Sequence, residues 1–236
     1  MTAGTDHGEA TAGDRAASRY RDEAGRAYHD GKRALDPAAF AWVSRLRAEK
    51  FQPWVAAESV VFELGVGAGW NLASLRCGRR IGSDVAGFLS DRVRELGVEF
   101  VTDPSQVAAS SADVVVCHHV LEHLVDPAGA LRECRRVLRP GGRLVVHVPW
   151  ERERGCRRFV PGEPNGHLYT WNAQNLGNLA GCLGWRVEQI RVRRYGYDRV
   201  SANVAARLGL GEAGFRGLRA LMVLFRPLRE VELVAR

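Results

Sequence analysis

Residues 60–70 read VVFELGVGAGW, an apolar run that passes directly into three glycines. The run VVFEL is typical of a buried strand. Gly65, Gly67 and Gly69 lack the Cβ atom that would obstruct a tight turn or a closely approaching ligand. A dinucleotide loop has the pattern G-x-G-x-x-G, but Trp70 stands at its sixth position and the pattern here is E-x-G-x-G-x-G. We therefore interpret the stretch as a nucleoside-binding turn behind the first strand of a sheet.

Apolar runs alternate with helical patterns along the rest of the chain. A helix is expected from Asp36-Pro37 to Pro53, and further helices are expected over about 70–78, 86–96, 127–138, 172–184 and 202–226. Strands are expected at 59–64, 80–85, 98–103, 112–118, 143–149, 185–192 and 230–236. This alternation predicts an α/β fold with a Rossmann-like, doubly wound sheet and helices on both faces. We expect a mobile leader over 1–17, an N-terminal helical segment or lid over 18–57, and one domain over 58–236.

Composition excludes little by itself. The chain has 236 residues, 46% of them hydrophobic, and a formal charge of +7 that comes almost entirely from arginine, so the charge is weak evidence for nucleic acid. The five cysteines form no C-x-x-C pair and indicate reduced thiols. No apolar run spans a membrane and the start lacks a signal peptide, so we expect a cytoplasmic protein without membrane contact. In the stretch 202–226 we expect a helix that covers the sheet, with arginine stems lying over apolar surface, in preference to a helix that binds a membrane.

Three acidic residues stand where a nucleoside would lie. Asp84, 17 residues beyond Gly67, ends the second strand and can accept hydrogen bonds from both ribose hydroxyls. Asp103 ends the third strand within reach of an adenine amino group, and Glu63 suits a cationic ligand. Each also has a structural interpretation: Asp84 as a helix cap, Asp103 as a turn former before Pro104, and Glu63 as an exposed strand end.

Three longer stretches match a known family: FELGVGAG (62–69), ADVVVCHHVLEHLVDP (112–127) and LRECRRVLRPGGRLVVHVP (131–149). With Asp84 they make the chain resemble the class I S-adenosylmethionine-dependent methyltransferases from about Val60 to Pro149. The resemblance implies a seven-stranded sheet whose last strand is antiparallel. It also implies that methionine and ribose lie along Glu63 to Gly69, that adenine lies near Asp103 and Pro104, and that His118 approaches the methionine part.

The histidines after the fourth strand raise a separate question. His119, Glu122 and His123 spell H-x-x-E-H, but a zinc hydrolase needs this motif on a long helix, and Pro127 leaves too little room. In most members of the family the equivalent residues shape the pocket. Ubiquinone-pathway and small-RNA O-methyltransferases carry an E-x-x-E-H version that binds a divalent ion together with a later His. The resemblance thus implies a metal site of His119, Glu122, His123 and His167 for Zn, Mn or Fe, although His119 replaces the first Glu.

The function that these features indicate is methyl transfer from S-adenosylmethionine to a small-molecule acceptor, most simply at a hydroxyl. His119 or His167 would remove the hydroxyl proton directly, or a metal would acidify it. The loop 150–171 carries four arginines and several aromatic residues, which suits an anionic or aromatic acceptor or simply a solvated surface (Arg152, Arg154, Arg157 and Arg158). The alternatives are an RNA 2′-O-methyltransferase, a cofactor-binding protein without turnover, and a nicotinamide dehydrogenase, which Trp70 disfavours.

Overall fold

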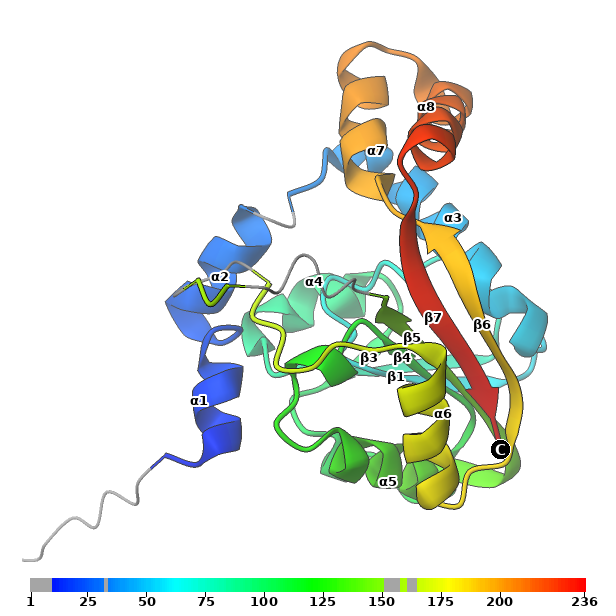
Figure 1. Ribbon diagram of the computed structural model, residues 1–236. Coiled ribbons are helices and arrows are strands. Elements are labelled where there is room, and N and C mark those ends of the chain that lie inside the picture. The colour runs from blue at the N-terminus through cyan, green and yellow to red at the C-terminus, as the bar shows by residue number, and fades with distance from the viewer. Residues whose placement is uncertain (1–9, 32–33, 151–157, 161–164) are drawn as a thin grey trace, which may run out of the picture.

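The computed structural model describes residues 10–31, 34–150, 158–160 and 165–236. Within them one sheet of seven strands has the order β3-β2-β1-β4-β5-β7-β6 (Figure 1). The strands are β1 (Val60–Leu64), β2 (Arg79–Ser83), β3 (Glu99–Val101), β4 (Ala112–His118), β5 (Leu138–Pro149), β6 (Val187–Tyr195) and β7 (Leu228–Ala235). Only β7 runs antiparallel to its neighbours, β5 and β6. This arrangement confirms the predicted fold class.

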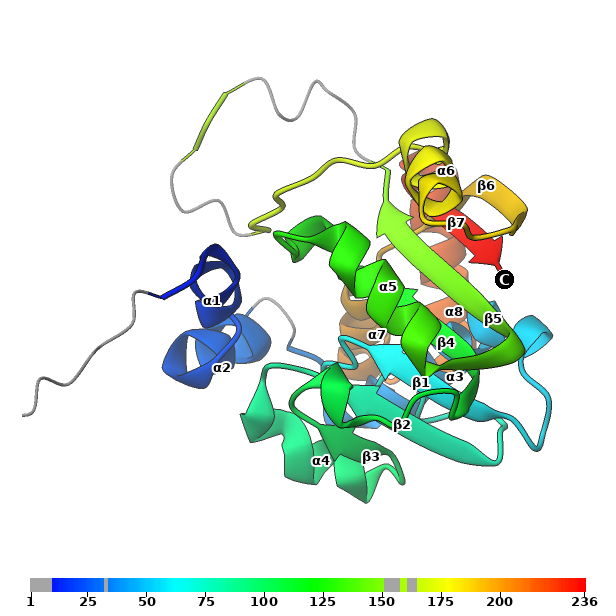
Figure 2. The same cartoon turned by 90° about the horizontal axis from the view of Figure 1, so that it is seen from below.

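Helices cover both faces of the sheet. Helices α5 (Pro127–Val137) and α6 (Ala173–Cys182) pack on one face, and α3 (Phe40–Phe51) and α4 (Ser90–Glu95) pack on the other (Figure 2). The central strand β4 supplies both cores, because Val115 and Cys117 point toward α5 and α6 while Val114 and Val116 point toward α3 and α4. A strand buried on both sides needs a continuous apolar run, which is why VVVC showed no alternation.

Short polar caps start the helices where the sequence predicts them. Asp126 accepts a hydrogen bond from the Gly129 N–H at 2.7 Å, with Pro127 in the first turn of α5. Asp36 accepts one from the Ala38 N–H at 2.9 Å and begins a 3-10 turn (Pro37–Ala39) that continues into α3. These caps fix the residues at which the two helical segments begin.

Two stretches before β2 differ in secondary structure from what the sequence predicts. The helix expected over 70–78 is absent: this stretch forms turns, with an isolated hydrogen bond from the Ala73 N–H to the Gly69 carbonyl. Within the stretch predicted to be a mobile leader (1–17), Thr11 and Asp14 form a capping box that starts a short helix, α1 (Ala12–Ser18). Residues 1–9 lie outside the described residues.

The stretch expected to be one helix over the sheet forms two, α7 (Asp198–Arg207) and α8 (Gly211–Phe225), which stand beyond the ends of β6 and β7 (Figure 1). The arginine side chains face inward: Arg216 contacts Glu49 at 2.7 Å and Arg219 contacts Asp198 at 2.7 Å. Phe215 is buried on the same side as these arginines, whereas Leu221, Leu224 and Phe225 are exposed. The expectation that this segment covers the sheet is therefore wrong, and so is the orientation of its two faces. No helix in the described ranges is long and apolar enough to cross a bilayer.

Candidate active site

A cavity of about 480 Å³ lies at the carboxyl ends of β1, β2 and β4. This volume lies within the range of small-molecule sites, about 300–1,000 Å³. Its floor is the glycine turn, and its walls include Asp84, His118 and His119. Tyr20, Tyr28 and His29, from the segment of α1 and α2 (Asp22–Asp30), close the outer side. The N-terminal segment thus contributes a wall to the cavity, at the place where a lid is predicted.

The glycine turn is shaped by its neighbours. Gly65 has φ 74°, and a Cβ atom there would overlap the Val120 side chain. The Gly67 N–H donates to the Asp84 carboxylate at 2.8 Å, and the Ala86 N–H donates to its other oxygen at 2.9 Å. Asp84 therefore fixes the turn after β1 to the turn after β2, and its carboxylate lies on the cavity wall.

Glu63 lies behind the wall rather than on it. Its side chain is fully buried and accepts a hydrogen bond from Asn71, which does line the cavity. Burial raises the pKa of Glu63 to about 8, against the opposing effect of the Asn71 hydrogen bond and the Arg47 charge. Glu63 is therefore placed to influence a ligand through Asn71, and the interpretation as an exposed strand end is wrong.

The third acidic residue has a different position. Asp103 is exposed and caps the turn Pro104–Gln106, where its carboxylate accepts the Ser105 N–H at 2.8 Å. Pro104 and Thr102 line the cavity, whereas Asp103 is not among the lining residues. The structure matches the turn-forming alternative for Asp103. Of the two residues predicted to lie near adenine, Pro104 lines the cavity and Asp103 does not.

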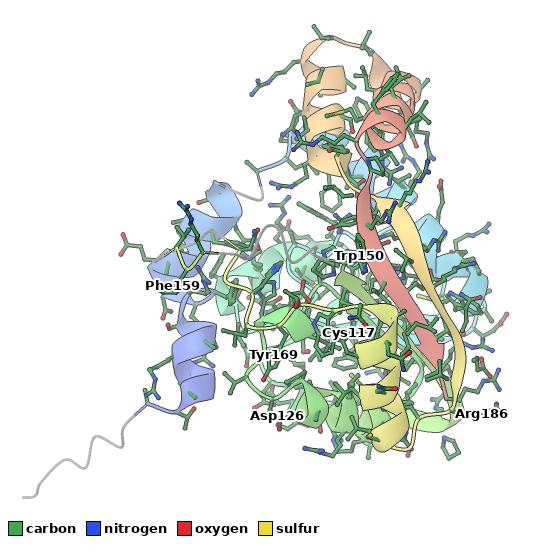
Figure 3. The ribbon with its side chains drawn as sticks, in the orientation of Figure 1. Cys117, Asp126, Trp150, Phe159, Tyr169 and Arg186 are labelled. Atoms are coloured by element: carbon green, nitrogen blue, oxygen red, sulfur yellow. The ribbon has the colours of Figure 1, made fainter. Side chains whose placement is uncertain are left out.

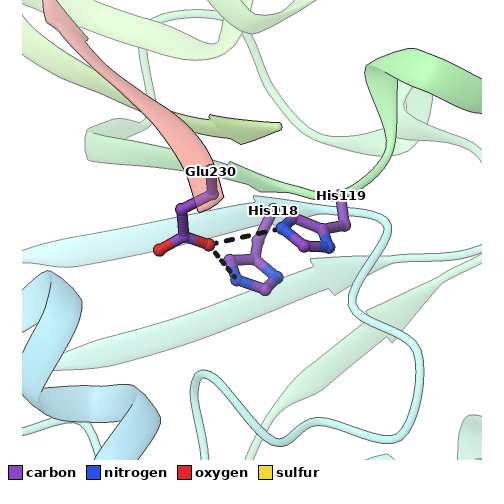
Figure 4. A group of neighbouring side chains, drawn as sticks. All are labelled: His118, His119 and Glu230. Carbon is purple, nitrogen blue, oxygen red and sulfur yellow. Dashed lines mark hydrogen bonds and ion pairs between the residues drawn. The ribbon is translucent and has the colours of Figure 1, made fainter. Parts of the chain in front are cut away.

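Two histidines end β4 beside a buried carboxylate (Figure 4). The rings of His118 and His119 stack with centroids 4.3 Å apart, and the left-handed backbone of His119, φ 55°, turns the second ring out of the strand. The Nε2 atom of His119 lies 3.3 Å from a carboxylate oxygen of Glu230 on β7. Burial lowers the pKa of His119 to about 4, although Glu230 acts in the opposite direction. His119 is therefore neutral at pH 7, with one ring nitrogen unprotonated.

A lysine completes this cluster. The Lys50 ammonium lies 2.7 Å from Glu230 and 3.1 Å from the Nε2 atom of His118. Desolvation alone would raise the pKa of Glu230, but the Lys50 charge and the hydrogen bonds from His119 and His147 hold it well below its ordinary value. Sequence reasoning missed both Lys50 and Glu230. A signal existed, because Glu230 and Glu232 alternate within the otherwise apolar last strand, where unpaired carboxylates would be costly.

The predicted metal set does not form one site. His119 belongs to a cluster with His118 and Glu230, whereas Glu122, His123 and His167 form another. Residues 121–123 form a 3-10 turn after the left-handed His119, so His119 and His123 share no helix face. His167 is not among the cavity-lining residues, so its predicted role as a base that contacts the acceptor lacks structural support.

The second cluster is compact. The ligand atoms of Glu122, His123 and His167 lie within 4.8 Å of one another. The Leu168 N–H donates to the Glu122 carbonyl at 2.7 Å, which fixes the loop of His167 against this turn, and the Tyr20 hydroxyl lies 2.9 Å from Nδ1 of His123. Of the loop arginines, Arg152, Arg154 and Arg157 lie outside the described residues, and Arg158 is exposed.

The comparisons with known proteins agree with this geometry. Residues 62–146 match the family model described as methyltransferase domain (Methyltransf_11). A protein of Mycolicibacterium smegmatis named "probable S-adenosylmethionine-dependent methyltransferase" is 42% identical over 79 residues, which are 34% of this chain and 30% of that protein. A ubiquinone biosynthesis O-methyltransferase of Xanthomonas oryzae is 43% identical over 49 residues, 21% of this chain and 20% of the relative. The chain thus matches only a minor part of the length of these curated relatives.

The fold extends further than the sequence similarity. The crystal structure of an S-adenosylmethionine-dependent methyltransferase from Aquifex aeolicus superposes with a TM-score of 0.54 at 18% identity, covering 89% of this chain and 98% of that one. At this identity the likeness concerns the fold alone. Residues 62–146 are thus similar to the methyltransferase domain family, and the sheet order and TM-score show that the chain has the fold of such proteins.

Proposed function

We propose that this chain transfers the methyl group of S-adenosylmethionine to a hydroxyl group of a small molecule. The observation that carries the proposal is that one cavity joins two sets of groups: the glycine turn with Asp84, which suits a nucleoside, and His119 backed by Glu230, which suits proton removal. Neither set alone would distinguish a transferase from a binding protein.

The cofactor position follows from the wall residues. A carboxylate has about four lone-pair sites, and two backbone N–H groups contact that of Asp84, so oxygen lone pairs remain for the ribose hydroxyls. Adenine would lie toward Thr102 and Pro104. The methionine part would extend toward Asn71 and Arg47, which both line the cavity, and the Arg47 charge suits the methionine carboxylate.

The proposed chemistry is an in-line displacement. The acceptor oxygen attacks the methyl carbon, the carbon–sulfur bond breaks with its electrons going to sulfur, and S-adenosylhomocysteine leaves. If Glu230 accepts the Nε2–H of His119, the Nδ1 atom keeps the free lone pair and takes the hydroxyl proton. The Glu230 carboxylate then stabilises the imidazolium, as the acidic member of a catalytic triad does.

A methyl-transfer assay with a panel of hydroxyl compounds, read by S-adenosylhomocysteine release, tests this proposal. Because general base catalysis contributes about 10²–10⁴-fold, His119→Gln is expected to lower kcat by that factor while S-adenosylhomocysteine binds as before. Undiminished turnover in His119→Gln, or exclusive methylation of nitrogen or carbon, would refute the assignment of His119 as the base.

We further propose that Glu122, His123 and His167 hold a divalent ion. Two imidazoles and one carboxylate suit Zn, Mn or Fe better than Mg. The cluster around His119 fits a metal poorly, because the Lys50 ammonium already neutralises Glu230. An ion held through His123, which lines the cavity, would acidify the acceptor hydroxyl. We expect the purified chain to contain one equivalent of metal by elemental analysis, lost in Glu122→Gln and kept in His119→Gln; equal metal content in the two variants would refute this site.

A further inference from the structure

Helix α8 exposes an uncharged face along its whole length. Its exposed positions follow a helical repeat and are all apolar or small (Ala213, Gly217, Ala220, Leu221, Leu224 and Phe225). We name these six residues the α8 stripe. Leu221, Leu224 and Phe225 are 55%, 61% and 82% exposed, and Leu208 and Leu210 extend the apolar surface into the turn before the helix. Apolar surface of this extent on a folded chain marks a binding site.

The charged residues of α8 lie on its opposite side. Glu212 pairs with Arg45, Arg216 pairs with Glu49, and Arg219 pairs with Asp198. These ion pairs hold α8 against α7 and α3 in this orientation, so the outward direction of the stripe is fixed by specific contacts. A substitution on the stripe should therefore leave the helix in place.

Arginines border the stripe at both ends. Arg207 stands at the end of α7 and Arg226 directly follows α8; both are exposed, and neither makes an ion pair within the described ranges. The acidic residues of 198–229 are the buried Asp198 and the paired Glu212. The segment thus presents apolar and cationic groups together, and the exposed acidic group nearest to α8, Glu49 of α3, is paired with Arg216 on the side opposite the stripe.

We propose that the α7–α8 hairpin docks on the surface of an anionic lipid bilayer. Apolar side chains flanked by arginines are the features by which an interfacial helix enters the headgroup region and binds anionic lipids. A second copy of the chain is a poorer occupant, because two-fold pairing of the stripe would bring the bordering arginines of both copies together. Strand β6 runs parallel to β5, so the hairpin leaves the sheet at the same edge as the cavity. Docking would therefore turn the carboxyl ends of the parallel strands, where the cavity lies, toward the membrane.

Sedimentation of the full chain with lipid vesicles tests the proposal independently of any methyl transfer. We expect binding to vesicles of phosphatidylcholine mixed with phosphatidylglycerol, and weaker binding to phosphatidylcholine alone or at high salt. Phe225→Gln is expected to lower the partition coefficient about tenfold, the value of burying one aromatic side chain. Phe159→Gln is the matched control, because Phe159 is 90% exposed and lies away from the α7–α8 hairpin (Figure 3).

Three results would overturn the proposal. The first is no sedimentation of the wild-type chain with anionic vesicles. The second is an equal loss of binding in the two phenylalanine variants. The third is a dimer, seen by analytical ultracentrifugation, that Phe225→Gln dissociates; that result would assign the α8 stripe to a second copy of this chain. Circular dichroism of both variants checks that the fold is retained.

Discussion

Substitution of Glu230 by glutamine tests the buried charge cluster beneath the histidines. The Glu230 side chain is fully buried, and its carboxylate contacts the Lys50 ammonium at 2.7 Å, while the Lys50 side chain is only 17% exposed. Glu230→Gln removes the negative charge and leaves this ammonium buried beside His118 and His119. Breaking a buried pair from one side costs about 3–5 kcal/mol. We expect the free energy of unfolding, measured by urea denaturation at pH 7, to fall by that amount.

An exposed ion pair supplies the control. Arg79 and Glu99 lie 2.6 Å apart with side chains 52% and 54% exposed, so Glu99→Gln should cost no more than about 1 kcal/mol. Adding Lys50→Met to Glu230→Gln removes the uncompensated charge and should restore most of the lost stability. A loss for Glu230→Gln no larger than that for Glu99→Gln, or no recovery with Lys50→Met, would refute the reasoning.

Two further predictions concern the glycine turn and the residue before it. The pKa of Glu63 is raised to about 8 in the folded state from an ordinary 4.5, so the wild-type chain loses stability as pH rises from about 4.5 to 8. Glu63→Gln should lack this loss, so the difference in unfolding free energy between the variant and wild type should shift by roughly 4 kcal/mol in favour of the variant between pH 5 and 8.5. A difference that stays constant with pH would contradict the buried carboxyl. Gly65→Ala should lose about 1–2 kcal/mol of unfolding free energy from the left-handed backbone alone, and more from the overlap of its Cβ atom with Val120. Gly181→Ala in α6 is the control, because a Cβ atom there meets nothing within 4 Å. In the same denaturation assay it should be neutral or stabilised by up to about 1 kcal/mol.

The sequence predicts well what local chemistry decides. Alternating apolar runs predict the sheet, caps such as Asp126 predict where helices begin, and the glycine spacing with Asp84 predicts the turn that lines the cavity. It fails where a contact depends on distant segments. Lys50 and Glu230 are 180 residues apart and meet only because β7 inserts between β5 and β6.

The remaining errors have similar causes. The H-x-x-E-H spacing suggests a shared ligand set only if the backbone is regular, and the positive φ of His119 interrupts it. In α8 the periodicity shows two faces, but the inward one is decided by Glu49 and Asp198 on other helices. Side-chain pairing across the fold therefore determined the details of the site that local patterns left undecided.

Isothermal titration calorimetry with S-adenosylhomocysteine tests the central claim most directly. The proposal predicts one binding site per chain, and affinity at least about tenfold lower in Asp84→Ala because charge-assisted hydrogen bonds to the ribose are lost. Asp103→Asn, which keeps an oxygen for the Ser105 N–H outside the cavity, should bind as wild type does. A chain that binds NAD but not S-adenosylhomocysteine, or an Asp84→Ala variant with unchanged affinity, would contradict the proposal.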